Sequence, residues 1–159
     1  MPTNPQHLIA TAIKPALFKL GLYSPAAEQL LLATAIQESN LIHRKQIGGP
    51  ALSYFQIEPK THNDIWDNFL KYRPQLSGKV IQLMSTLAAD KIKELENNDK
   101  YAAAIARIHY LRVPAPLPKH NDIAKMAAYW KRYYNTALGK GQESDFINNW
   151  NKYKGNVHP

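Results

Sequence analysis

The sequence predicts a mainly α fold with at most a small β-hairpin, in one domain that covers residues 1–159. Apolar residues recur three and four positions apart through most of the chain, which is the spacing of one helix face. Proline and glycine interrupt this pattern and divide it into separate helices. Hydrophobic residues make up 45% of the 159 residues, which is enough for an ordinary apolar core in a chain of this length.

The first two helices follow from periodicity and end signals. A helix is predicted over residues 6–20, with a kink or a division into two short helices at Pro15. A second helix begins with Ser24 as N-cap and Pro25 at the first helical position, and it is expected to run to about His43. This second helix is apolar on almost every side, which indicates that it passes through the middle of the protein.

From residue 43 onward the chain alternates between turns and helices. Glycine and proline interrupt residues 43–59, so we expect a loop there with room for a small hairpin. The run from Val113 to Pro118, VPAPLP, requires an extended turn. The remaining segments have helical periodicity, and we expect helices over residues 61–70, 77–95, 99–112 and 121–137 and around Phe146 and Trp150.

The charge balance is strongly basic. Twenty Lys and Arg residues against twelve Asp and Glu give a net charge of +8 and a pI near 9.6. Such a field favours polyanionic partners, among them nucleic acid, anionic membranes and the anionic polymers of a bacterial wall. The basic residues are scattered, however, and the densest clusters are pairs such as Lys131–Arg132. We therefore do not expect nucleic acid to be the main partner.

Several classes of site are disfavoured by what the sequence lacks. No apolar run is long enough to span a membrane, and the first residues, MPTNPQH, do not have the pattern of a signal peptide. The absence of cysteine excludes disulfides and thiolate zinc sites. The six histidines never lie three or four positions apart, and Gly48–Gly49 lacks the Lys of a phosphate loop. We therefore expect neither a metal nor another cofactor.

One acidic residue conflicts with its surroundings. Glu38 lies near the end of the apolar central helix, and its helical neighbours are mostly apolar: Leu31, Thr34, Ala35, Leu41 and Ile42. A carboxyl group that is partly removed from water has a raised pKa and stays protonated nearer to neutral pH. Such a group is suited to protonate the leaving oxygen when a glycosidic bond breaks. The alternative is a glutamate at a helix end that reaches into solvent.

The residues after Glu38 form a pattern with a known counterpart. Glu38–Ser39 is followed by Gly-Gly-Pro-Ala at residues 48–51 and by Tyr-Phe-Gln-Ile-Glu-Pro-Lys-Thr at residues 54–61. This resembles the soluble lytic transglycosylases and goose-type lysozymes of the lysozyme superfamily, whose helix-ending Glu-Ser is followed by Gly-Ala and by Gly-Leu-Met-Gln, two hydrophobic residues and Pro-x-Thr. Gln56 has the family's spacing from the glutamate, and the register continues at Ala51, Pro59 and Thr61.

The resemblance implies a lysozyme-like helical domain with a catalytic cleft between the central helix and the following loop. It implies that Glu38 is the catalytic acid and base, that Ser39 helps to position the site, and that Gln56 lines the sugar-binding cleft. These roles rest on the match of residue types and spacing over Glu38 to Thr61.

Two further expectations concern aromatic residues near this cleft. Ser53 stands where the family has glycine, and Tyr54–Phe55 replaces its Leu-Met pair, so we expect Tyr54 and Phe55 to form the apolar walls. The family also has a downstream Ala-Tyr-Asn-Ala-Gly element whose tyrosine faces the site. Tyr110 and the pair Tyr134–Asn135 each match part of it, and we favour Tyr110 as the substrate-binding residue.

The product of the reaction depends on whether a second carboxylate takes part. Glu58, Asp64 and Asp67 lie close in sequence to the expected cleft, although Asp64 also fits an ordinary capping arrangement. Without a second acid, the resemblance implies lytic transglycosylation of the β-1,4 bond between N-acetylmuramic acid and N-acetylglucosamine, which leaves 1,6-anhydromuramyl ends. We favour this outcome. With a second carboxylate that activates water, the protein is a hydrolytic muramidase on the same bond.

The resemblance therefore predicts an enzyme whose partner is the glycan strands of peptidoglycan, with other virion proteins as further partners. The absence of a recognisable signal peptide is more typical of a phage-encoded member. Such a member is carried in the virion or held in the host cytoplasm before release, and it acts on the wall in the periplasm. Two other classes stay open, namely a non-catalytic structural protein of the virion and a basic helical nucleic-acid-binding protein.

Overall fold

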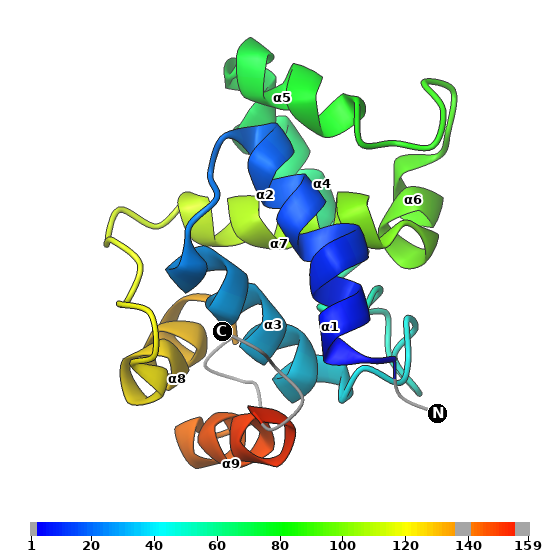
Figure 1. Ribbon diagram of the computed structural model, residues 1–159. Helices are drawn as coiled ribbons and strands as arrows, with labels where there is room; N and C mark the ends of the chain where they lie inside the picture. Colours follow the sequence, from blue (N-terminus) through cyan, green and yellow to red (C-terminus); the bar gives the residue numbers. More distant parts are fainter. Residues whose placement is uncertain (1–2, 136–140, 155–159) are drawn as a thin grey trace.

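The computed structural model is arranged around two buried helices, α3 (Pro25–Ser39) and α7 (Asp99–Leu111), as Figure 1 shows. The structure describes residues 3–135 and 141–154. In these two ranges the only paired extended backbone consists of two isolated bridges, Lys45–Leu52 and Leu52–Ile57. The prediction of a mainly α fold is confirmed, and the small hairpin that it allowed is reduced to these bridges.

The other helices pack around this pair. An N-terminal rod of three consecutive helical segments lies against α7 and α3, while α4, α5 and α6 pack on α7, and α9 packs on both α3 and α8 (Figure 1). The bounds are α1 Pro5–Leu8, the π-helical η1 Ile9–Ile13, α2 Lys14–Leu20, α4 Pro59–Asn68, the 3₁₀ helix η2 Leu70–Tyr72, α5 Pro74–Ile81, α6 Lys91–Asn97, α8 Ile123–Tyr133 and α9 Glu143–Tyr153.

The rod is continuous but locally widened next to Pro15. The Lys14 N–H donates to the carbonyl of Ile9, which closes a π turn immediately before the proline. Proline has no N–H and its ring crowds the preceding turn, so a wider turn accommodates it without ending the helix. The predicted kink at Pro15 is therefore a π segment. The rod ends at Gly21, whose φ of 70° is readily adopted by glycine.

The two central helices are buried around most of their circumference. In α3 the buried residues run without a gap from Gln29 to Ile36, and in α7 they run from Tyr101 to Ile108. The apolar residues of both runs belong to one hydrophobic cluster that extends from Leu8 to Trp150. Ser24 caps α3 as predicted, because its Oγ accepts the N–H of Ala27 at 3.0 Å. Among the described helices, none has the length and apolar character needed to cross a membrane.

Helix α3 is shorter than the sequence predicted. It ends at Ser39 rather than near His43, because Asn40 and Leu41 have positive φ angles of 52° and 59°. The Asn40 N–H still donates to the carbonyl of Ile36 at 2.9 Å, so Asn40 takes the left-handed position that follows many helices. The consequence for the site is that Glu38 lies in the last turn of α3, where its side chain leaves the core.

The prediction of a single helix over residues 77–95 was also wrong. Two helices occupy this region, α5 and α6, and residues 82–90 between them are not regular helix. The carboxylate of Asp90 accepts the N–H of Ile92 at 2.9 Å and starts α6 as a new helix. The apolar residues of this region contact the core from two directions, with Val80 and Leu95 buried while Leu87 is 84% exposed.

A buried polar chain joins α4 to α7. The Trp66 indole N–H donates to the Tyr101 hydroxyl at 2.9 Å, and His62 Nε2 lies 2.7 Å from the same hydroxyl. His62 Nδ1 lies 3.0 Å from the Asn63 Oδ1, an acceptor, so Nδ1 carries the hydrogen and Nε2 accepts from Tyr101. The single Tyr101 hydroxyl thus forms hydrogen bonds with both Trp66 and His62.

Replacing Tyr101 by phenylalanine removes this hydroxyl and leaves the buried His62 ring nitrogen and the partly buried Trp66 indole N–H without this partner. We expect Tyr101→Phe to lower the free energy of unfolding by about 1–3 kcal/mol, the usual cost of an unsatisfied buried group. The measurement is the urea midpoint at constant m-value. Tyr72→Phe is the matched control, since Tyr72 is 67% exposed, and it should leave the midpoint unchanged. Equal midpoints for both variants would contradict this account.

Candidate active site

Glu38 is held at the end of α3 by a hydrogen bond from a distant helix. The indole Nε1 of Trp130, on α8, donates to the Glu38 Oε2 at 2.9 Å. Trp130 is fully buried and packs its ring against Phe146 of α9. Gly141 packs against the same indole ring, so closely that a Cβ added at this position would lie 2.8 Å from the ring. The position of the half-buried Glu38 carboxyl is therefore fixed by α8 and α9 as well as by α3.

Burial raises the pKa of Glu38 from its ordinary 4.5 to about 7. Loss of water disfavours the charged carboxylate, and this effect is larger than the opposing effect of the Trp130 N–H, which stabilises the charge. The raised pKa agrees with the expectation from the apolar helical neighbours. At neutral pH the group is thus divided between its acid and its base form, which suits a group that must donate and then recover a proton.

A cavity of about 390 Å³ opens beside Glu38. It lies between the end of α3, the loop that follows it, α4, α7 and the chain after α8. Its lining residues are Glu38, Gln46, Ala51, Gln56, Ile57, Glu58, Thr61, His109, Tyr134 and Asn135. The structure therefore brings together Glu38 and Gln56, as the sequence predicted, along with the Ala51 and Thr61 of the same pattern.

The loop wall of this cavity depends on two residues with left-handed backbone. Ser53 has a φ of 73° and Gln56 a φ of 51°. Ser53 occupies the position where the resembled family has glycine, and its φ is one that favours glycine. Its Oγ accepts the N–H of Phe55 at 3.1 Å, a local bond that helps a residue other than glycine to adopt this turn. The Gln56 side-chain Nε2 donates to the Ser53 carbonyl at 2.7 Å, and within the described ranges no donor is paired with its Oε1.

Three of the residues predicted for the site do not line the cavity, which corrects the expectations for Tyr54, Phe55 and Tyr110; Ser39, which was expected to help position the site, does not line it either. Phe55 is fully buried and Tyr54 is 6% exposed, because the turn directs both rings into the core. Tyr110 is 1% exposed, and its hydroxyl lies 2.8 Å from the Thr34 Oγ1 inside the bundle. The Ser39 hydroxyl donates to the carbonyl of Ala35 at 3.0 Å, so it belongs to the last turn of α3.

Tyr134, rather than Tyr110, is the tyrosine that faces the cavity. Its hydroxyl donates to the carbonyl of Phe55 at 2.6 Å, and its ring stacks on Tyr110 with 5.0 Å between ring centres. The bond ties the end of α8 to the loop wall. The sequence signal that identifies this residue was the Tyr134–Asn135 pair, the second of the two partial matches to the family's downstream element.

His109 is a cavity residue that sequence reasoning did not select. Its Nδ1 accepts a hydrogen bond from the Arg112 Nη2 at 2.9 Å, and the Arg112 Nη1 donates to the Asp64 Oδ2 at 2.7 Å. Because arginine only donates, Nδ1 has no hydrogen and the neutral ring carries its hydrogen on Nε2. Burial and the positive charge of Arg112 lower the pKa of His109 to about 4, whereas Asp64 acts in the opposite direction.

The three carboxylates considered as second acids lie in different places. Glu58 lines the cavity together with Glu38 and is exposed. Asp64 is bound by Arg112 and also accepts from the Asn68 side-chain amide at 2.6 Å, which lowers its pKa. Asp67 belongs to a separate pocket beside Trp66. Of the three, only Glu58 shares the cavity of Glu38.

The described residues contain no group of three or more His, Cys, Asp or Glu side chains arranged to hold a metal ion. Comparison with family models, curated proteins and solved structures finds no match to the chain.

The raised pKa of Glu38 predicts how stability depends on pH. Between pH 4.5 and about 7 the folded protein binds more protons than the unfolded chain, so this group makes stability fall as pH rises through that range. Glu38→Gln should remove this dependence, and its stability relative to wild type should rise from pH 4.5 to about 7 and then stay constant. Paired urea titrations and the ¹³C titration of the Glu38 carboxyl test this. A carboxyl midpoint near 4.5 would contradict it.

The His109 network predicts two opposite shifts in one pKa. Arg112→Gln removes the positive charge that disfavours the imidazolium, so the His109 pKa should rise from about 4. Asp64→Asn removes a favourable negative charge, so the same pKa should fall. Long-range ¹H–¹⁵N spectra at a series of pH values measure the pKa and show which nitrogen carries the hydrogen. Shifts in the same direction, or a hydrogen on Nδ1 in the wild type, would refute the assignment.

Proposed function

We propose that this protein cleaves the glycan strands of peptidoglycan at the β-1,4 bond between N-acetylmuramic acid and N-acetylglucosamine, with Glu38 as general acid and base. The observation that carries the proposal is the half-buried Glu38 carboxyl with a pKa of about 7 at the edge of a cavity. The Glu38–Thr61 pattern supports it, because Ala51, Gln56 and Thr61 line the same cavity.

In the first step, protonated Glu38 gives its proton to the glycosidic oxygen as the bond to the muramyl C1 breaks. The resulting carboxylate then takes the proton of the attacking hydroxyl group, which restores the acid form. In lytic transglycosylation the attacking group is the muramyl 6-hydroxyl, and its oxygen closes a 1,6-anhydro ring on C1. Because this hydroxyl belongs to the same sugar, the second step is intramolecular and gains from proximity.

The neutral groups of the cavity are suited to hold the sugar. The Gln56 Oε1 has no donor among the described residues, so it can accept from a sugar hydroxyl or acetamido N–H, while Nε2 is used within the loop. His109 offers a neutral Nε2–H, because its Nδ1 is occupied by Arg112. With a pKa of about 4, His109 does not compete with Glu38 for the reacting proton near neutral pH.

Hydrolysis of the same bond is the second candidate, and Glu58 is the observation that favours it. A hydrolytic muramidase requires a carboxylate to activate water or stabilise the intermediate. Glu58 lines the cavity at the start of α4 and is exposed to water. Transglycosylation is favoured here because it requires Glu38 alone.

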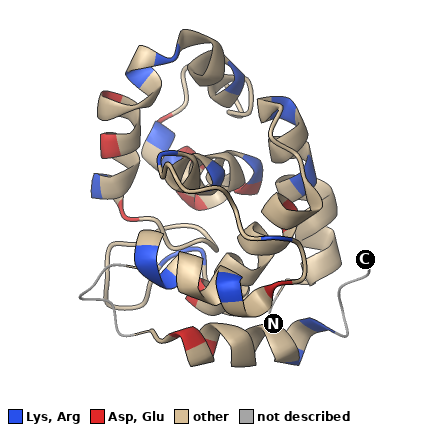
Figure 2. Ribbon diagram, turned by 90° about the vertical axis from the view of Figure 1, so that its left-hand side faces the viewer, with Lys and Arg blue, Asp and Glu red and all other residues tan. Residues whose placement is uncertain are grey.

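The proposed partner is thus the peptidoglycan of the wall. If a phage particle carries the protein, other virion proteins are further partners. The positive charges do not gather into one stripe, since Lys and Arg are distributed over several helices in Figure 2. This distribution is better suited to weak attraction toward an anionic wall than to a defined nucleic-acid groove.

Glu38→Gln should abolish clearing of purified peptidoglycan in a zymogram, because the near-isosteric amide has no acidic proton to donate. The rate for the wild type should fall as pH rises through about 7, where the acid form is lost. Asp67→Asn, which neutralises an acid outside the cavity, is the matched control and should clear normally. Equal clearing by wild type and Glu38→Gln would remove Glu38 from the mechanism.

Glu58→Gln and mass spectrometry of the products separate the two reactions. Transglycosylation predicts anhydro ends and retained activity in Glu58→Gln, whereas hydrolysis predicts reducing ends and a large loss of activity. If peptidoglycan is not cleaved and DNA is bound with a steep salt dependence, the nucleic-acid-binding class is favoured instead. If neither occurs, the fold serves a structural role.

A further inference from the structure

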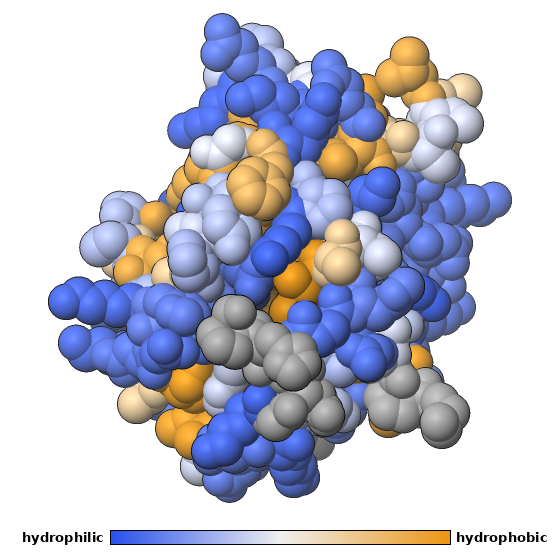
Figure 3. Space-filling model, viewed as in Figure 1, coloured by the Kyte–Doolittle hydropathy of each residue, from blue (hydrophilic) through white to orange (hydrophobic). Residues whose placement is uncertain are grey.

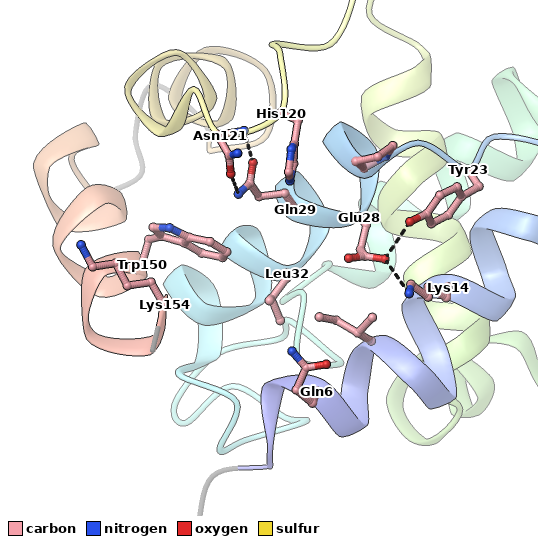
Figure 4. Close-up of a pocket in the computed structure, with 12 residues that line it drawn as sticks. Gln6, Lys14, Tyr23, Glu28, Gln29, Leu32, His120, Asn121, Trp150 and Lys154 are labelled. Carbon is pink, nitrogen blue, oxygen red and sulfur yellow. Dashed lines mark hydrogen bonds and ion pairs between the residues drawn. The ribbon is translucent and has the colours of Figure 1, made fainter. Parts of the chain in front are cut away.

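A second and larger cavity, of about 560 Å³, lies on the other side of α3. It is enclosed by the N-terminal rod, the first half of α3, the turn at residues 120–121 and α9, as Figure 4 shows. It shares no lining residue with the cavity of Glu38. Gln29 of this cavity and Glu38 are nine residues apart, or about two and a half helical turns, so they face opposite sides of α3.

The floor of the second cavity is apolar, and its rim is polar. Ile9, Leu32 and Pro25 supply apolar surface, with Leu32 near the centre of the view in Figure 4. On the face of the molecule seen in Figure 3, apolar surface shows between hydrophilic side chains. An apolar floor with a few polar groups around it is the usual composition of a small-molecule site.

Three side chains of this rim already use acceptor atoms within the protein. Glu28 accepts from the Tyr23 hydroxyl at 3.2 Å and lies 3.7 Å from the Lys14 ammonium group. The side chains of Gln29 and Asn121 satisfy each other, since the Gln29 Nε2 donates to the Asn121 Oδ1 at 3.0 Å and the Gln29 Oε1 accepts the Asn121 N–H. These Gln29, Asn121 and Glu28 oxygens are therefore held by protein donors rather than left for a ligand.

The donors of the rim are in excess. The Gln6 Nε2 is buried and has no hydrogen-bond partner among the residues that the structure describes, and Gln6 points into the cavity in Figure 4. In the described part of the chain no acceptor is paired with the Trp150 indole N–H or with the Lys154 ammonium group, both on the α9 side. Two lysines, Lys14 and Lys154, stand against one acid, Glu28. The cavity thus presents spare N–H donors and an excess of positive charge.

We propose that the second cavity binds a small ligand that carries an anionic oxygen group, either carboxylate or phosphate, on a sugar or polyol skeleton. The anionic oxygens accept from the Gln6 Nε2, the positive charge of Lys154 lies on the α9 side of the rim, and the carbon skeleton lies on the apolar floor. A buried donor that forms no hydrogen bond destabilises the protein. A ligand that supplies an acceptor recovers this free energy when it binds. This inference goes beyond the proposed cleavage and does not depend on it.

The test is a titration of the full-length protein followed by ¹H–¹⁵N spectra. The probes are N-acetylmuramic acid for the carboxylate, glycerol 3-phosphate for the phosphate, and N-acetylglucosamine as the neutral control. At least one anionic probe should shift the Gln6 side-chain amide and the Trp150 indole N–H in a saturable way, and the neutral sugar should not. The probe that binds more tightly identifies the source of the anionic group.

Variants then locate the ligand. Gln6→Glu replaces the spare donor by a carboxylate and should weaken binding at least tenfold, while Lys154→Gln should weaken it severalfold. Lys152→Gln removes a charge from the same helix outside the cavity and should bind as wild type does. Glu38→Gln should also bind normally, whatever its effect on peptidoglycan. Melting temperatures confirm that each variant is folded.

Three results would overturn the proposal. The first is the absence of shifts at Gln6 and Trp150 with both anionic probes. The second is equal binding of the neutral sugar, which would refute the need for an anionic group. The third is unchanged affinity in Gln6→Glu, or shifts confined to the side-chain amides of Gln46 and Gln56, which would place the ligand in the cavity of Glu38.

Discussion

The hydrogen bond between Glu38 and Trp130 is the contact on which the site depends. It joins residues 92 positions apart, and it places a carboxyl group of raised pKa at the point where a buried helix reaches the surface. A carboxyl group in solvent would ionise at its ordinary pKa and be a poor proton donor near neutral pH. The fully buried indole prevents this by closing one side of the group while still donating a hydrogen bond to it.

The same loss of water acts in opposite directions on the two titratable groups that matter most in the cavity. It raises the pKa of Glu38 and lowers that of His109, because the carboxyl is neutral when protonated and the imidazole is neutral when deprotonated. Near neutral pH, His109 is thus an uncharged donor and Glu38 is the group that changes its protonation. Arg112, linked to Asp64, fixes the tautomer of His109, so α4 contributes to the site through a chain of two hydrogen bonds.

The wall opposite Glu38 is built by backbone geometry more than by bulky side chains. The left-handed turn at Ser53 directs Phe55 into the core and leaves Gln56 at the cavity. The carbonyl of Phe55 then accepts from Tyr134, which connects this turn to the end of α8. Phe55 and Tyr110 therefore support the cavity from behind, while Tyr134 and several polar side chains face the space that a sugar would fill.

The sequence by itself determined the helical class, the start of α3 at Ser24–Pro25 and the end of the rod at Gly21, because these depend on neighbours within a few positions along the chain. The apolar neighbours of Glu38 in its own helix also indicated a raised pKa, but the Trp130 indole that closes one side of the carboxyl comes from a distant helix. The sequence also selected Gln56 from its spacing. Only the tertiary structure decided that Tyr54, Phe55 and Tyr110 turn inward, that Tyr134 and His109 face the cavity, and that Trp130 bonds Glu38. Periodicity does not distinguish an aromatic ring at a cleft from one in the core, because that difference is set by which distant helix packs against it.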